Sequence, residues 1–181
     1  GKRIWRNDNL AGISLINNWD SISTNWTMFN DTTPGISKIS ALSISKSPAN
    51  RLYYGTNSKN LYRVDNANTA SPVPVDITST LSSALFPTGA NISCIAVNPN
   101  NADEILVTFS NYNVQSVFYS STGGLPTTSW SRVGGNLEPG SGWGPSVRWA
   151  SILPVSDGKI YMLATSTGIY ATDTLMGTST V

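Results

Sequence analysis

The sequence has no histidine, a single cysteine and only two glutamates. Without histidine, the chain supplies neither a Ser-His-Asp nor a Cys-His catalytic arrangement, and no imidazole ligand for zinc. The single cysteine, Cys94, excludes an intramolecular disulfide. Because Cys94 lies within the apolar run 92–97, we expect it to be a small buried hydrophobe.

Charge is also scarce, at 12% of the residues with a formal net charge of +1 and no run of Lys or Arg. Such a chain has no field that would gather nucleic acid or anionic lipid. No apolar run reaches the roughly 18 residues that a membrane span needs. None of the eight aspartates lies within three positions of another, so the sequence predicts no local calcium loop, and we expect no metal or cofactor.

Ser, Thr and Asn are abundant and together occupy 63 of the 181 positions. Thr favours strands, Asn and Ser favour turns, and the helix formers Glu and Lys are rare. The composition therefore predicts an all-β protein with a surface rich in hydroxyl and amide groups.

Three sets of short apolar segments recur along the chain. The first set carries an aromatic residue at positions 5, 62, 119 and 170, and the second set begins at positions 39, 92 and 147. The third set, at 51–56, 104–109 and 159–165, contains Tyr53, Tyr54 and Tyr161, which we expect to be packing residues. A weaker fourth strand is predicted at 73–77 and 129–133, where prolines confine the former to an edge.

A period of 51–57 residues suits one four-stranded antiparallel sheet with its turns. We therefore predict a β-propeller fragment within a longer polypeptide, with any export signal outside this chain. Its units are the outer strands of one blade at 1–38, complete blades at 39–91 and 92–146, and the start of a further blade at 147–181.

The segment 119–124 and the following Trp130 resemble the Asp-box, or bacterial neuraminidase repeat, with Thr122 in place of its acid and Gly124 at its glycine. Asp8, Asp65 and Asp173 hold the corresponding position in the other units. The resemblance implies that these are structural residues of outer hairpin turns, which agrees with the preference of Asp and Thr for local backbone amides.

A second likeness covers residues 92–175, which resemble the propeller region of large proteins that Bacteroidetes export through the type IX secretion system. It implies an extracellular or cell-surface protein. Bacteria of that group attach O-glycans at Asp followed by Ser or Thr, a pattern that Ser21, Thr32 and Thr174 fit.

The segment 140–149 is the most suggestive binding stretch, because a glycine-rich loop with Trp143 leads into a strand that begins with Arg148 and Trp149. Tryptophan in such a loop stacks on sugars or peptide side chains. The alternative is that Trp143 covers a groove between sheets and Trp149 packs between them.

Three functions follow from these features. The first is a non-enzymatic propeller for adhesion, recognition or display, with a protein or carbohydrate ligand. The second is a sialidase- or xyloglucanase-like glycoside hydrolase whose paired carboxylates lie outside this segment, since Glu104 is expected to be solvated and Glu138 precedes Pro139 in a loop. The third is a structural module or the cargo of a secretion channel.

Overall fold

The computed structural model describes residues 1–9, 25–29, 37–139 and 144–177. Strands hold 48% of these described residues and helices 4%, which confirms the all-β prediction. The strands are β1 (Trp5–Asn7), β2 (Trp26–Met28), β3 (Ile39–Lys46), β4 (Ala49–Thr56), β5 (Leu61–Val64), β6 (Pro74–Asp76), β7 (Ile92–Asn98), β8 (Asn101–Phe109), β9 (Val117–Ser120), β10 (Ser131–Arg132), β11 (Val147–Val155), β12 (Gly158–Thr165) and β13 (Gly168–Thr172). The described residues also form the short 3-10 helices η2 (Ser82–Ala84), between β6 and β7, and η3 (Gly135–Leu137), between β10 and β11.

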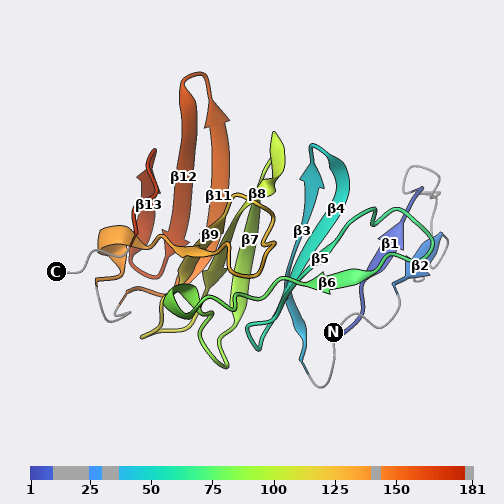
Figure 1. The fold of residues 1–181 in the computed structure, drawn as a ribbon, viewed down its shortest axis with the longest axis horizontal. Helices are drawn as coiled ribbons and strands as arrows, with labels where there is room; N and C mark the ends of the chain where they lie inside the picture. Colours follow the sequence, from blue (N-terminus) through green and yellow to red (C-terminus); the bar gives the residue numbers. More distant parts are fainter. Residues whose placement is uncertain (10–24, 30–36, 140–143, 178–181) are drawn as a thin grey trace, which may run out of the picture.

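Each sheet is built from one continuous stretch of chain. The sheets β3-β4-β5-β6 and β7-β8-β9-β10 have four strands, β11-β12-β13 has three, and β1-β2 has two. All neighbouring strands are antiparallel. The sheets stand side by side in chain order (Figure 1). Within the part of the chain that the structure describes, no sheet closes on itself.

The same register recurs in the three larger sheets. The first strand of each sheet has a bulge at its second residue, at Ser40, Ser93 and Arg148. Aligning these bulges sets residues of different sheets in equivalent positions. Ala41, for example, is equivalent to Cys94 and to Trp149, because each is the first residue after the bulge in its strand.

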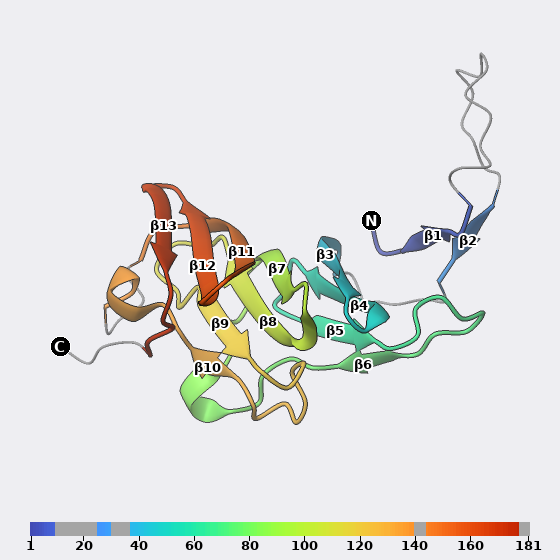
Figure 2. The same ribbon diagram turned by 90° about the horizontal axis from the view of Figure 1, so that it is seen from above.

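The sheets pack face to face, as Figure 2 shows from above. We call the side that a sheet turns toward the preceding sheet its N-side face, and the opposite side its C-side face. β7 contacts both β3 and β11, so the first strands of the three sheets are neighbours. The bulge serines tie them together: Ser40 Oγ donates to the carbonyl of Ile92 at 2.7 Å, and Ser93 Oγ to that of Val147 at 2.8 Å.

Apolar side chains fill both interfaces of the middle sheet. The C-side face of sheet β3–β6 meets the N-side face of sheet β7–β10, with buried side chains from both: Ala41, Tyr53, Leu61, Ile95, Ile105, Val107 and Phe118. The next interface joins Cys94, Ala96, Leu106, Val117, Ala150, Ile152 and Tyr161. Burial of Cys94, Tyr53, Tyr54 and Tyr161 is as predicted, each being at most 7% exposed.

The register corrects one detail of the sequence repeat. Tyr62 and Tyr170 are equivalent to Phe118, whereas Tyr119 lies one position later, because Tyr62, Phe118 and Tyr170 pair with Tyr54, Val107 and Leu163. A shift of one residue moves a side chain to the other face of a sheet. The structural equivalent of Asp65 and Asp173 is therefore Ser121, not Thr122.

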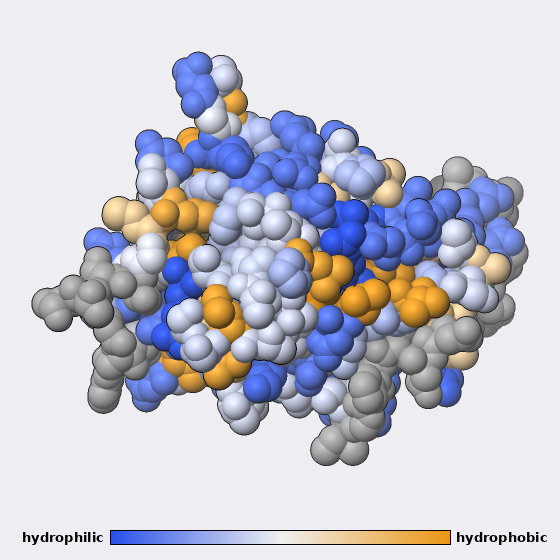
Figure 3. All heavy atoms as spheres, in the orientation of Figure 1, coloured by the Kyte–Doolittle hydropathy of each residue, from blue (hydrophilic) through white to orange (hydrophobic). Residues whose placement is uncertain are grey.

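The surface seen in Figure 3 is mainly hydrophilic, with apolar residues in separate patches. Among the described residues, no helix has the length and apolar character that crossing a bilayer would require.

Candidate functional site

The ends of the sheets where β3, β7 and β11 begin are built alike. Three equivalent backbone N–H groups, in the loops that follow β4, β8 and β12, donate to the carbonyl of the residue just before the first strand. The bonds are Asn57 to Lys38 (2.9 Å), Ser110 to Asn91 (3.1 Å) and Ser166 to Ser146 (2.9 Å). We call this surface the inner loop end.

Asparagine side chains hold the loops of the inner loop end in place. Asn57 Oδ1 accepts the Lys38 N–H at 2.8 Å, and Asn111 Oδ1 accepts the Asn91 N–H at 2.7 Å. Ser146 Oγ donates to the Ser110 carbonyl at 2.6 Å, which joins the loops of two neighbouring sheets. The loops are therefore attached to the sheets through groups that lie 19 to 36 positions apart in the sequence.

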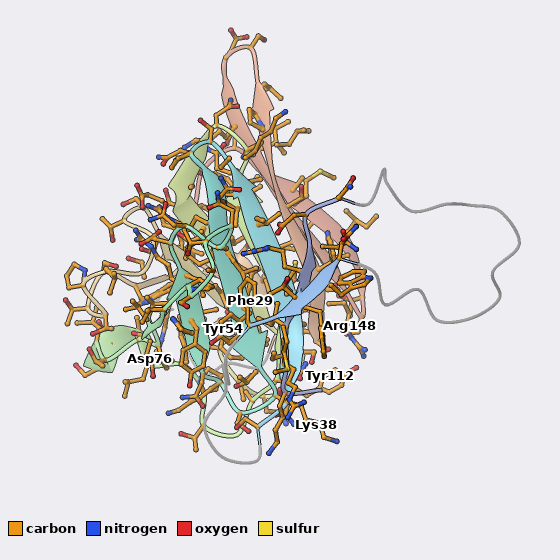
Figure 4. All side chains as sticks on the ribbon, turned by 90° about the vertical axis from the view of Figure 1, so that its right-hand side faces the viewer. Phe29, Lys38, Tyr54, Asp76, Tyr112 and Arg148 are labelled. Atoms are coloured by element: carbon orange, nitrogen blue, oxygen red, sulfur yellow. The ribbon has the colours of Figure 1, made fainter. Side chains whose placement is uncertain are left out.

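Tyr112 and Arg148 are the exposed side chains that meet at the inner loop end. Tyr112 is 59% exposed, and Arg148 is exposed on its bulge. Hydrogen bonds with Ser166 and with Arg148 lower the pKa of Tyr112. Figure 4 shows Lys38, Tyr112 and Arg148 along one side of the molecule and Asp76 across from them. This places a phenol and a guanidinium, groups that bind polar ligands, on the open surface.

The other two residues of the predicted binding stretch are placed differently. Trp143 lies outside the described residues. Trp149 follows Arg148 on β11 but lies on the C-side face of its sheet, where it is 63% exposed. The structure thus separates Trp149 from the inner loop end, and its position matches that of the packing residues Ala41 and Cys94.

The prediction that Glu104 is solvated is wrong, because the residue is only 3% exposed. Lys159 Nζ donates to its two oxygens at 2.7 and 2.8 Å, Asn98 Nδ2 donates at 2.6 Å and the Tyr161 hydroxyl at 2.8 Å. Burial raises the pKa of Glu104, but the bonds from Lys159, Asn98 and Tyr161 outweigh it and lower that pKa below its ordinary value. Glu104 is therefore a buried carboxylate that joins β8 to β12.

Two tyrosines surround the Glu104 carboxylate. Burial and the hydrogen bond to Glu104 raise the pKa of Tyr161 to about 12. Burial and the charge of Glu104 also raise the pKa of Tyr119, whose hydroxyl lies 3.2 Å from Glu104 Oε1. A phenol that is harder to ionise is a poorer nucleophile.

The second glutamate, Glu138, is fully buried at 0% exposure, close to Gly134 and Gly144. Its Oε1 accepts the backbone N–H of Ser116 at 2.5 Å. Burial raises its pKa to about 7, against the lowering effect of that bond. A Cβ atom at Gly134 would approach Glu138 Oε2 to 2.1 Å and one at Gly144 would approach its Cγ to 2.8 Å, so both positions require glycine.

The Asp-box-like turn after β9 is held by Ser120. Its Oγ accepts the N–H groups of Thr122 at 3.2 Å and Gly124 at 3.0 Å, and Thr122 Oγ1 contacts that oxygen at 3.3 Å. Gly124 has φ +79°, and a Cβ there would meet Ile77 and Trp130. Trp130 is 1% exposed and donates from Nε1 to the Ile77 carbonyl at 2.9 Å, which fastens this turn to the preceding sheet.

The three aspartates of the Asp-box-like set have separate partners. Asp8 pairs with Arg6 at 2.8 Å, Asp65 pairs with Arg51 at 2.6 Å and with Arg63 at 2.9 Å, and Asp173 Oδ1 accepts from Thr174 Oγ1 at 3.1 Å. Of the predicted glycosylation positions, Thr174 is exposed, whereas Ser21 and Thr32 lie outside the described residues.

Sequence reasoning missed the ion-pair network between the first two large sheets. Arg51 Nη1 lies 2.5 Å from Asp103 Oδ1, and Arg63 Nη1 lies 3.6 Å from the same oxygen. The bonds of both arginines lower the pKa of Asp65, against the opposing effect of its burial. Tyr53 and Arg63 are cross-strand partners, which places Arg63 on the face that carries this network. The sequence alone did not show this placement, because it depends on the register of β4 with β5.

Grooves open between the described elements of the fold in at least two places. One of about 270 Å³ lies between η3 and the outer part of sheet β11–β13, with Leu106, Leu137 and Tyr170 in its lining. The other, of about 290 Å³, lies between β1-β2 and β3, with Trp5, Leu42 and Ile44 in its lining. Within the part of the chain that the structure describes, no three His, Cys, Asp or Glu side chains are grouped as metal ligands would be.

Comparison of the chain with protein-family models and with curated proteins found no match.

Proposed function

We propose that this chain is part of an exported β-propeller of Asp-box type that binds a protein or carbohydrate ligand at its inner loop end. Face-to-face packing of the sheets and the adjacency of their first strands support the propeller, because a propeller arranges four-stranded blades in this way around a central axis. Export by Bacteroidetes to the cell surface rests on the sequence resemblance alone.

The binding role rests on one observation, the exposed pair of Tyr112 and Arg148. Loops presented by a rigid scaffold commonly bind ligands. Here the scaffold is the repeated bond between each loop and the start of each first strand, such as Ser166 N–H to Ser146. The guanidinium donates to carboxylate or hydroxyl oxygens, and the phenol ring offers a face for stacking.

Binding is favoured over glycoside hydrolysis by the placement of the glutamates. Glycosidases need carboxyl groups that flank the scissile bond. Glu104 and Glu138 are 3% and 0% exposed, and Glu104 is neutralised by Lys159. Neither carboxylate faces a substrate from within this part of the chain.

A glycan array with neutral and acidic oligosaccharides tests the binding role. The whole chain is compared with Arg148→Ala and Tyr112→Ala, and with Lys46→Ala, which alters an exposed cation at the end of β3 far from its start. We expect the first two variants to lose binding and Lys46→Ala to keep it. Absence of binding to any glycan, together with failure of surface-peptide libraries to bind, would refute the proposed function.

A further inference from the structure

The C-side face of sheet β11–β13 is an open apolar surface. Trp149 is 63% exposed, Ile169 76% and Leu153 47%. Trp149 pairs with Ala164, which pairs with Ile169, so the side chains of Trp149, Ala164 and Ile169 lie in one row across the three strands. The face carries no charged side chain along that row.

The equivalent row of the middle sheet shows what such a face packs against. Cys94 and Val117, the equivalents of Trp149 and Ile169, are 4% and 1% exposed. They lie in the apolar cluster that the N-side face of sheet β11–β13 completes, with Ala150 and Ile152. The row at Ala41 and Leu61 in sheet β3–β6 is covered in the same way by the middle sheet.

The outer edge of this sheet is open as well. β6 pairs with β5, and β10 pairs with β9, so the two complete sheets end in a short fourth strand. Within the described residues, β13 pairs only with β12. All five of its residues are exposed.

Both covered interfaces carry one ion pair at the same two positions, whereas the open face does not. Arg51 and Glu104 occupy equivalent positions on the C-side faces of their sheets. Arg51 pairs with Asp103, and Glu104 pairs with Lys159. Asp103 and Lys159 are themselves equivalent, on the N-side faces of the next sheets. At the open face this position holds Ile160. A neighbour that set a charge against Ile160 would leave that charge without the partner that Arg51 and Glu104 provide in the covered interfaces.

The bulge position also differs at the open face. Ser40 and Ser93 donate to the carbonyl of the next sheet's first strand, and Arg148 stands in their place. Its guanidinium instead hydrogen-bonds Tyr112, in the loop that follows β8 of the preceding sheet.

We propose that a further four-stranded sheet of the same repeat covers this face, with an uncharged side chain opposite Ile160. The exposed row of Trp149 and Ile169, compared with the covered equivalent rows, indicates that a further surface packs here. The inference rests on the proposed propeller only in identifying that surface as another sheet of the repeat. A second copy of this chain fits less well, because Ile4 and Phe29, which flank β1 and β2, already cover Tyr54 and Tyr62 on the N-side face of its first large sheet. Among the described residues of β3, Leu42 and Ile44 stay exposed on that face.

The test extends the chain by one repeat. Residues 1–172 are followed by a second copy of 65–139, joined where β13 and β5 end at equivalent residues. A second version carries Asp103→Leu in the appended copy only, which removes the charge that would face Ile160. Acrylamide quenching of Trp149 is isolated by comparing each protein with its Trp149→Phe version.

We expect quenching of Trp149 to fall several-fold in the extended chain and thermal stability to be higher with Asp103→Leu in the appended copy. A folded extended chain in which Trp149 is as accessible as before overturns the proposal. Glycan binding, measured on the same proteins, reports separately on the inner loop end, so failure of the proposed function is distinguished from failure of this inference.

Variants of the chain itself test the face even where the extension does not fold. Trp149→Lys should leave the melting temperature unchanged and abolish binding of an apolar dye, as should Ile169→Lys. Val73→Lys, at a position that is 72% exposed elsewhere, is the matched control and should keep dye binding. If Trp149→Lys destabilises the chain as strongly as Cys94→Lys, the face is already covered and the proposal is wrong.

Discussion

The two interfaces between the large sheets use the same pair of positions with opposite signs. In the first interface, a cation on the preceding sheet faces an anion, Arg51 with Asp103. In the second, an anion on the preceding sheet faces a cation, Glu104 with Lys159. Because exchange of the sheets would set like charges together, the reversal specifies which sheet lies next to which, in addition to any effect on stability.

The two pairs also differ in burial. The Glu104 side chain is 4% exposed, whereas that of Asp103 is 43% exposed. A buried ion whose partner is removed is left without compensation, while an exposed ion recovers hydration. We therefore expect the second interface to be the more sensitive one.

The largest effect is expected where like charges are forced together in the second interface. Glu104→Lys should lower the free energy of unfolding by about 3–5 kcal/mol, because it buries a lysine against Lys159. Urea denaturation followed by circular dichroism measures the loss. Glu104→Lys combined with Lys159→Glu should recover part of it, and Asp157→Lys, at an exposed turn, is the control. A single variant as stable as the parent chain would show that the pair does not organise this interface.

The two buried glutamates should respond to pH in opposite directions. The pKa of Glu138 is raised to about 7 in the folded chain, so its protonated form is favoured and the free energy of unfolding should fall as pH rises from about 4.5 to 7. The full change is up to about 3 kcal/mol, at 1.36 kcal/mol per pKa unit. The pKa of Glu104 is lowered in the folded chain, so its ionised form is favoured. The contribution of Glu104 to the free energy of unfolding should therefore be lost as pH falls below the pKa that this group has in the unfolded chain.

Thermal unfolding across this pH range, with Glu138→Gln and Glu104→Gln, measures the two effects. Glu138→Gln should flatten the decline between pH 4.5 and 7, and Glu104→Gln should remove the loss at lower pH. Persistence of the decline in Glu138→Gln would assign it to another group.

A smaller effect is expected in the first interface. Arg51→Ala should cost about 1–2 kcal/mol, because Asp103 is partly hydrated and Arg63 lies 3.6 Å from the same oxygen. Combining Arg51→Ala with Asp103→Ala in a double-mutant cycle measures the coupling of the pair. A loss as large as that of Glu104→Lys would contradict the ranking of the two interfaces by burial.

The smallest effect is expected at Asp8, which follows β1 of the two-stranded sheet and corresponds to Asp65. Asp8 pairs with Arg6, but its side chain is 60% exposed. Asp8→Ala should therefore change stability by less than about 0.5 kcal/mol. Chemical denaturation beside the Asp65→Ala variant measures the difference, and an Asp8→Ala loss equal to that of Asp65→Ala would show that exposure does not set the order.

The sequence predicted the strands well where several local signals agreed. The segments at 39–44, 51–56 and 92–97 are β3, β4 and β7. The weak fourth strands at 73–77 and 129–133 are observed as β6 and β10, each shorter than predicted. Strand propensity and turn chemistry depend on neighbours in the chain, so they are legible without the fold.

The site was predicted only in part, because exposure depends on which sheet lies opposite. Glu104 follows a turn and has the pattern of a solvated residue, yet β12 brings Lys159 and Tyr161 over it. Tyr112 was missed, since a single tyrosine among asparagines carries no local signal. The one-residue slip at Tyr119 arose because the aromatic pair 118–119 offers two alignments, and only cross-strand pairing separates them.

The sequence by itself determined the all-β class, the strand segments and the period of the repeat, because these follow from local propensities and turns. Only the tertiary structure decided the register between repeats, the burial of Glu104 and Glu138, and the separation of Trp149 from Arg148. The physical reason is that the register and the burial of a side chain depend on a surface that a distant segment of the chain supplies. The alternation of side chains along a strand defines two faces, but it does not specify which neighbouring sheet covers each face.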